Sequence, residues 1–486
     1  MIAKIWNRLH VWLAIGLIAG LVLDGIALTA FADDDDGRCE IEDDDGNLET
    51  DGFCADQAIV RLASGADVTA VNETFATETI DPIAGQQVFL LALPQGSDEV
   101  AVAAQLQGDS RVVWAELNYV DQAPEGSPRR FFPRGGDSPQ PGTLDQAYAP
   151  DVLGVPAALA CATGRGITVA IIDSGLDPSH PAFANTPRRG EWNAFSNQDG
   201  AGNVDDIGNA EDDDGDGIKD EMTGHGTHVA GIVTQIAPGA TIMPIKALDS
   251  DGVGQAFYLA RAIYQAVAQN ADIINLSLGS TANTQVVREA TDGAIAASIF
   301  VAAAAGNAGV EGPREFPATL DGVFGVAATD AADRQADFTS VHSSLSLSAP
   351  GVDIVSAFPP EQPPNQKFGS PYARWNGTSM ATPWVAGAAA LLLNSNPGWT
   401  PGDVANRLRN TAAPINGPSA GMGSGRLDVA AAVDCGPGAA PLTATADDSD
   451  TSIKSDTNSK KDKKKKKSKN KKDKKRKLNK KRNNRR

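Results

Sequence analysis

The middle of the chain alternates between short apolar runs and longer helical stretches. The four clearest apolar runs cover residues 166–172, 241–248, 271–279 and 299–307. Continuous apolar runs of this length are typical of strands buried on both faces of a parallel sheet. Helical stretches such as 255–269 alternate with them. The pattern predicts an α/β domain over about residues 144–436, with a doubly wound, mainly parallel sheet flanked by helices.

A smaller unit is predicted before this domain, over residues 55–121. Strands are expected at residues 58–63, 88–94 and 111–120, and a helix at 97–107 with Ser97 as its N-cap. This order of elements predicts a small α+β domain. The following residues, 122–143, are rich in Pro and Gly and contain three arginines. They are expected to form a linker that is open to proteolytic processing.

Charge separates the two ends of the chain from each other. The formal net charge is −19, but residues 441–486 carry 20 Lys and Arg against 6 Asp and Glu, and the rest carries 22 against 55. The predicted tail, residues 437–486, has low complexity and is expected to be disordered. It either binds polyanionic surfaces or serves only as a solubilising tail. The acidic segment 33–54 is expected to be flexible.

The first 32 residues have the pattern of a signal peptide. Lys4 and Arg8 precede an apolar run from Val11 to Leu23, and residues 30–32 read Ala-Phe-Ala. The run is short for a membrane span, so export is favoured over an uncleaved anchor. The predicted location is extracellular, and the basic tail is compatible with association with the cell envelope.

Export permits disulfides, and the chain has four cysteines. Four cysteines allow three pairings. Chain order favours Cys39 with Cys54 and Cys161 with Cys435, while free thiols are the alternative.

Three short motifs lie where predicted strands end or helices begin. AIIDSGLD places Asp173 directly after a strand, GHGTHVAG places His225 at a helix start, and NGTSMATPWVAG places Ser379 at another. Pro383 is expected in the first turn of that last helix. A serine hydroxyl becomes a nucleophile when a neutral imidazole takes its proton, and the imidazole needs a carboxylate on its other nitrogen. Asn307, after another buried strand, can donate to a developing oxyanion.

These three motifs and Asn307, in the order Asp, His, Asn, Ser, resemble the active-site segments of the subtilisin-like serine proteases (the subtilase or S8 family) over about residues 144–436. The resemblance implies a secreted serine endopeptidase that is made as a proenzyme and acts on proteins and peptides. It makes Asp173, His225 and Ser379 the catalytic triad and Asn307 part of the oxyanion hole. Residues 55–121 resemble the family's inhibitory propeptide, which would act as an intramolecular inhibitor. A monomer is the default expectation.

The resemblance also assigns two segments that would pair with an extended substrate as added strands. They are Gly252, Val253 and Gly254, and Ser277, Leu278 and Gly279.

An acidic run precedes His225 and resembles the start of an EF-hand-type loop. Its predicted calcium ligands are Asp212, Asp214, Asp216, the carbonyl of Ile218, and Asp220. Such a calcium ion would be structural, and no catalytic cofactor is expected. The alternative is a solvated acidic loop without a cation.

Two other functions are alternatives to the protease. A metal-dependent hydrolase would use His225, His228 and the acidic run, but the ligand spacing of common zinc motifs is missing. His228 is therefore expected to be a packed, hydrogen-bonded histidine. A non-catalytic protein that binds polyanions through its tail is the third possibility.

Overall fold

The structure is a computed structural model that describes residues 41–42, 52–124, 139–211, 218–362, 366–367 and 369–436. We call residues 52–124 the N-terminal domain and residues 139–436 the main domain. The predicted signal peptide and basic tail lie outside the described residues. None of the described helices is both long and apolar enough to span a membrane.

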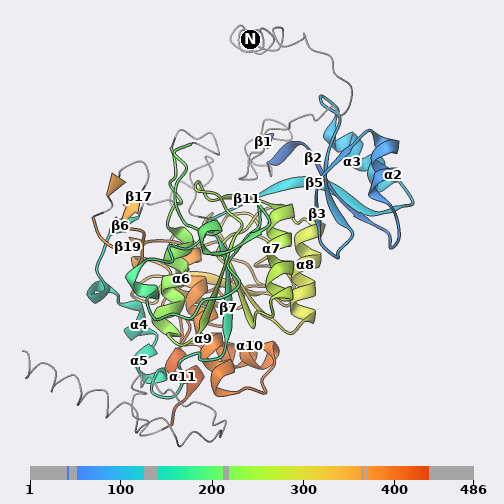
Figure 1. Cartoon of the computed structure of the whole chain (residues 1–486). Coiled ribbons are helices and arrows are strands. Elements are labelled where there is room, and N and C mark those ends of the chain that lie inside the picture. The colour runs from blue at the N-terminus through green and yellow to red at the C-terminus, as the bar shows by residue number, and fades with distance from the viewer. Residues whose placement is uncertain are drawn as a thin grey trace, which may run out of the picture. The chain divides into compact units, whose positions relative to one another are not determined.

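An eight-stranded sheet forms the centre of the main domain (Figure 1). Its strands pair in parallel, except for the antiparallel pair at one edge. Most of its strand residues are fully buried, as the continuous apolar runs predicted. In spatial order the strands are β15 (Leu347–Pro350), β14 (Phe324–Thr329), β13 (Phe300–Ala304), β12 (Ile273–Leu276), β7 (Thr168–Asp173), β10 (Thr241–Lys246), β8 (Trp192–Asn193) and β9 (Gln198–Asp199).

Helices cover both faces of this sheet. Helices α6 (His225–Ile236) and α9 (Thr378–Ser395) pack on each other and on β7, whereas α7 (Ala256–Ala268) and α8 (Gln285–Ala296) pack together on the other face (Figure 1). The predicted doubly wound α/β fold is confirmed. Shorter helices complete the domain: α4 (Ala149–Val152), α5 (Val155–Ala158), α10 (Pro401–Asn410) and α11 (Val429–Val433).

Small antiparallel sheets lie beside the main one. Strand β19 (Tyr372–Trp375) lies between β16 (Ile354–Ala357) and β6 (Gln140–Pro141). A separate hairpin joins β17 (Glu361–Gln362) to β18 (Gln366–Lys367).

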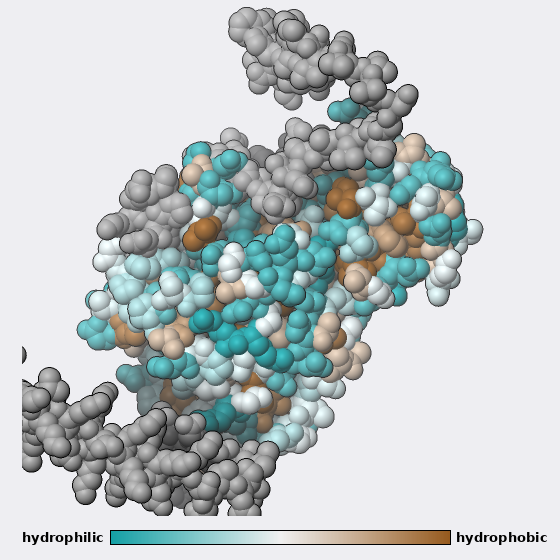
Figure 2. Space-filling model, viewed as in Figure 1, coloured by the Kyte–Doolittle hydropathy of each residue, from teal (hydrophilic) through white to brown (hydrophobic). Residues whose placement is uncertain are grey.

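The N-terminal domain is an antiparallel sheet with two helices. Its central strands β5 (Val112–Gln122), β2 (Phe53–Leu62), β4 (Val88–Ala92) and β3 (Glu78–Ile83) follow one another across the sheet, and β1 (Ile41–Glu42) pairs with β2. Its helices are α2 (Val68–Phe75) and α3 (Glu99–Gln107). On the face of the molecule drawn in Figure 2, the surface is mostly hydrophilic with small apolar patches. Ile80, Val100 and Val113 are among the exposed large apolar side chains of this domain.

Three local expectations for this domain differ from the structure. Strand β2 begins at Phe53, within the segment expected to be flexible, because Phe53 is buried and packs edge-on against Tyr119. The N-cap of α3 is Asp98 instead of Ser97, since the Asp98 carboxylate accepts a hydrogen bond from the Ala101 N–H at 2.9 Å. Helix α2 and strand β3 were not predicted.

One disulfide joins the beginning and the end of the main domain. Cys161 is bonded to Cys435 across 274 residues, which confirms the predicted pair. Cys54 is also disulfide-bonded, and its partner lies outside the described residues. The Cys161–Cys435 disulfide links the loop after α5 to the residues after α11 at the edge of the domain.

Candidate active site

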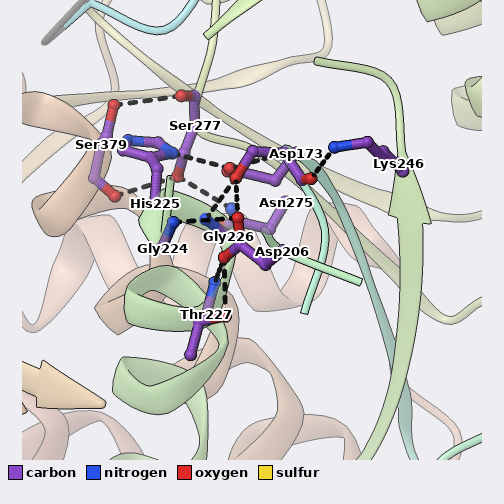
Figure 3. A network of polar contacts seen from close by, with 11 residues as sticks. Asp173, Asp206, Gly224, His225, Gly226, Thr227, Lys246, Asn275, Ser277 and Ser379 are labelled. Carbon is purple, nitrogen blue, oxygen red and sulfur yellow. Dashed lines mark hydrogen bonds and ion pairs between the residues drawn. The ribbon is translucent and has the colours of Figure 1, made fainter. Parts of the chain in front are cut away.

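A buried carboxylate and a buried imidazole meet at the end of β7. Asp173 is the last residue of that strand and His225 is the first residue of α6, and neither side chain is exposed. Asp173 Oδ1 lies 2.6 Å from His225 Nδ1 and accepts the N–H of Ser174 at 2.8 Å (Figure 3). This contact keeps the hydrogen on Nδ1, so Nε2 on the opposite side of the ring is available as a base.

A second buried carboxylate, Asp206, holds the start of α6 in place. Its Oδ1 accepts hydrogen bonds from the Gly224 N–H at 2.9 Å and the Ser174 hydroxyl at 3.0 Å. Its Oδ2 accepts the N–H and the hydroxyl of Thr227 at 2.9 and 2.6 Å (Figure 3). The N-cap of α6 is Gly224, which has no side chain, so Asp206 supplies the missing cap from 18 residues away.

Asp206 was not predicted from the sequence. Its only local signal is an acidic residue before the His motif, in a stretch without regular periodicity. Its role depends on contacts with β7 and α6 that no local pattern reports.

Ser379 lies in the first turn of α9, and Figure 3 draws the His225 ring between it and Asp173. Its hydroxyl donates to the carbonyl of Ser277 at 3.0 Å, and the Ser277 hydroxyl donates back to the Ser379 carbonyl at 2.9 Å.

Pro383 explains the hydrogen bond from the Ser277 hydroxyl to the Ser379 carbonyl. Pro383 lies in the helix interior, so the prediction of a first-turn position is wrong. Its missing N–H would otherwise bond to the Ser379 carbonyl four residues earlier, and Ser277 supplies a donor instead.

Asn307 lies beside the same helix start. Its Oδ1 accepts the Thr378 N–H at 3.0 Å and the Thr378 hydroxyl at 2.9 Å. Because a backbone N–H can only donate, the amide oxygen must face Thr378. The Asn307 Nδ2 group is thereby directed to the opposite side of the amide, as a donor.

His228 lies one turn further along α6 and has a different environment. It is fully buried, and its Nε2 lies 3.1 Å from the carbonyls of both Ile354 and Ala373. Burial lowers the pKa of His228 to about 3, so the ring is neutral at ordinary pH. Among the described residues no group of three or more His, Cys, Asp or Glu is arranged to hold a metal ion. These contacts match the expectation of a packed histidine.

The predicted calcium ligands are only partly described. Asp212, Asp214 and Asp216 lie outside the described residues, whereas Ile218 and Asp220 lie within them. The Asp220 carboxylate is buried and accepts the N–H groups of Asn209 at 2.7 Å and Ala210 at 3.1 Å. The Asp220 carboxylate is therefore held by hydrogen bonds from the backbone N–H groups of Asn209 and Ala210. The calcium site stays a prediction that depends on the three remaining aspartates.

The last strand of the N-terminal domain lies between the two predicted substrate segments. Val120, Asp121 and Gln122 of β5 pair antiparallel with strand β11 (Val253–Gln255), and the Ala123 N–H donates to the Gly252 carbonyl at 2.9 Å. On the other side Gln122 exchanges two backbone hydrogen bonds with Gly279, at 2.9 and 3.0 Å. We call this the strand-pairing site. Its occupation agrees with Ser379 being fully buried.

The N-terminal domain also contacts the main domain at the starts of α7 and α8. We call this second contact the helix face. Neither helix has a hydrogen bond from its own N-cap side chain. Glu116 accepts the N–H groups of Gln285 and Val286 at 2.7 and 2.8 Å, and Asn118 accepts that of Phe257 at 3.2 Å. Further side-chain contacts to the main domain are Arg61 and Trp114 with Glu289, and Asp81 with Arg261.

Burial raises the pKa of Glu116 to about 6. The two backbone N–H groups that it accepts act in the opposite direction and lower the pKa, while the nearby carboxylate of Glu289 raises it further.

Comparison with known proteins shows one family. The model of the subtilase family (Peptidase S8) matches residues 164–428. The chain is 37% identical over 288 residues to subtilisin NAT from Bacillus subtilis subsp. natto, and the match covers 56% of this chain and 66% of that protein. It is equally 37% identical over 288 residues to a subtilisin from Bacillus pumilus, of which the match covers 92%.

A solved structure extends the likeness in fold. Fervidolysin from Fervidobacterium pennivorans, described as a keratinolytic enzyme related to subtilisin, superposes with a TM-score of 0.66 at 24% identity. The superposition covers 83% of this chain and 64% of fervidolysin. At this identity it supports the fold alone.

Proposed function

Since the chain belongs to the subtilase family of serine peptidases, we propose that it is a serine endopeptidase that is exported as a proenzyme. Ser379 would be the nucleophile, His225 the general base and Asp173 the residue that orients His225. The observation that carries the proposal is the buried contact of 2.6 Å between Asp173 and His225, next to a serine at a helix start.

The proposed reaction is acyl transfer through an acyl-enzyme. His225 Nε2 takes the Ser379 proton as Oγ attacks the substrate carbonyl, and the resulting imidazolium is stabilised by Asp173. Asn307 Nδ2 and the Ser379 N–H would donate to the oxyanion. His225 then gives the proton to the leaving amine, and water hydrolyses the acyl-enzyme by the same steps in reverse order.

Substrates would bind as an added strand at the strand-pairing site, because the backbone of Gly254 and Gly279 already pairs there with an extended segment. The N-terminal domain, which occupies this site, would act as the propeptide. The acidic run before His225 would hold a structural calcium ion through Asp212, Asp214, Asp216, the Ile218 carbonyl and Asp220.

A fluorophosphonate probe tests the assignment directly. It should label Ser379 once the N-terminal domain has been removed, and Ser379→Ala should abolish both labelling and casein hydrolysis. Labelling should persist in EDTA at low temperature, because no metal takes part in the proposed chemistry. Casein hydrolysis by the Ser379→Ala protein would contradict the proposal.

A further inference from the structure

The register of the strand-pairing site identifies the residue that the N-terminal domain presents to the nucleophile. Gln122 pairs antiparallel with Gly279 and exchanges both backbone hydrogen bonds with it. In an antiparallel pair such hydrogen-bonded positions recur every second residue. Continuing this register by two residues places position 124 opposite Ser277. The Ser277 carbonyl is the group that lies 3.0 Å from Ser379 Oγ.

The residue at position 124 is a buried proline. An ordinary residue here would donate its N–H to the Ser277 carbonyl and complete the pairing. Pro124 has no N–H. The Ser277 carbonyl instead accepts the hydroxyl hydrogen of Ser379. A hydroxyl has one hydrogen, so Ser277 and His225 are alternative acceptors for it while Pro124 is bound.

We propose that Pro124 makes the N-terminal domain a slowly cut inhibitor, because it prevents efficient attack of Ser379 on the carbonyl of residue 124. This inference rests on the proposed function. The disfavoured step is formation of a Ser379 Oγ–acyl bond with loss of the peptide nitrogen of residue 125, which would take its proton from His225. Release of the domain therefore requires cleavage of another peptide bond.

Besides the missing N–H of Pro124, two further features support the proposal. The pyrrolidine ring fixes φ near −65°, whereas pairing as an antiparallel strand needs a more extended backbone. The two residues before Pro124 make backbone hydrogen bonds to the main domain, Gln122 with Gly279 and Ala123 with Gly252. The domain is thus held in register up to the residue at which cleavage would occur.

The test compares the full-length chain with Pro124→Leu and Pro124→Ala. Intact-mass spectrometry follows the appearance of an N-terminal fragment that ends at residue 124. The hydrogen bond to the Ser277 carbonyl that proline cannot make, together with its fixed φ, corresponds to at least about a tenfold effect, so both variants should be cut at this bond at least about tenfold faster than the original chain. Pro94→Leu, in the same domain but outside the strand-pairing site, is the matched control and should leave the rate unchanged. Equal rates for the original chain and the Pro124 variants would overturn the proposal.

A peptide assay makes the result independent of how the variants fold. The main domain, activated with an added protease, is given Val-Asp-Gln-Ala-Pro and Val-Asp-Gln-Ala-Leu p-nitroanilides. The proline peptide should have a kcat/KM at least about tenfold lower. Equal values would contradict the role of Pro124. A main domain that neither hydrolyses the leucine peptide nor reacts with a fluorophosphonate would instead show that the proposed function is wrong.

Discussion

The N-terminal domain contacts the main domain at two places that differ in kind. At the helix face the contacts are made by particular side chains, such as Glu116 and Asn118, which bond to the first N–H groups of α8 and α7. At the strand-pairing site the contacts are made by the backbone, through Gly252, Gly254 and Gly279. Almost any extended peptide can make the second kind of contact, but few can make the first.

This difference separates recognition from inhibition. A substrate can compete with the domain only at the strand-pairing site, since the helix face requires side chains held by a folded sheet. Each site can therefore be changed without changing the other. The following predictions are ordered from the largest expected effect to the smallest.

Ser379→Ala should remove catalysis and leave both contact sites intact. In subtilisin the loss of the nucleophile lowers kcat by about 10⁶-fold, and we expect a loss of that order in peptide hydrolysis. The N-terminal domain should still bind to the activated main domain with an unchanged dissociation constant, which calorimetry can measure. A large loss of binding would show that Ser379 also holds the inhibitor.

Asp206→Asn should impair catalysis without touching either contact site. The amide puts an NH₂ group where the carboxylate now accepts four hydrogen bonds from Ser174, Gly224 and Thr227. The resulting shift of His225 should lower kcat by about ten- to hundredfold. Peptide hydrolysis measures kcat and KM, and KM should change little.

Asp205→Asn is the matched control for this substitution, and we expect it to keep nearly full activity. Equal losses in the two variants would contradict a specific positioning role for Asp206.

Glu116→Ala should weaken the helix face alone. It leaves the Gln285 and Val286 N–H groups without their acceptor, a change that typically corresponds to about a tenfold loss of affinity. The inhibition constant of the N-terminal domain against the activated main domain measures this. The exposed Glu73→Gln serves as the control. An unchanged constant would mean that the backbone pairing accounts for all of the affinity.

The pH dependence of the inhibition constant should reflect the titration of Glu116. Glu116 has a pKa of about 6 when docked, above its ordinary value of 4.5. The docked state therefore holds the proton more tightly, so docking is strongest below about pH 4.5 and weakens as the pH rises through 6, by up to about thirtyfold. Glu116→Gln should remove this step, as a titration of the inhibition constant from pH 4 to 8 would detect. A step that persists in the Gln variant would assign it to another group.

Much of the candidate site was predictable because each motif combines a local structural signal with a reactive side chain. Buried strands read as apolar runs, and the residues that follow them, such as Asp173 and Asn307, lie at the same edge of the parallel sheet. The structure brings Asp173 and His225 together as the motifs predicted. Their catalytic roles stay predictions.

Other features had no local signal. Helix α2 is only eight residues long, too short for its apolar spacing to be distinctive, and strand β3 was missed because most of its residues are exposed. The position of Pro383 inside α9 was misjudged because the compensating donor, the Ser277 hydroxyl, is about a hundred residues away.

By itself, the sequence determined the doubly wound fold and the residues brought to the edge of the sheet, which depend on periodicity and on chemistry within a few residues. The two segments able to pair with a peptide were assigned by the resemblance to the subtilases. Only the tertiary structure decided how Asp206 holds the His225 helix, which side chains cap α7 and α8, and the pairing of Gln122 with Gly279 from which the place of Pro124 is inferred. Those relations depend on distances between residues far apart in the chain, which packing and strand register fix and local sequence does not encode.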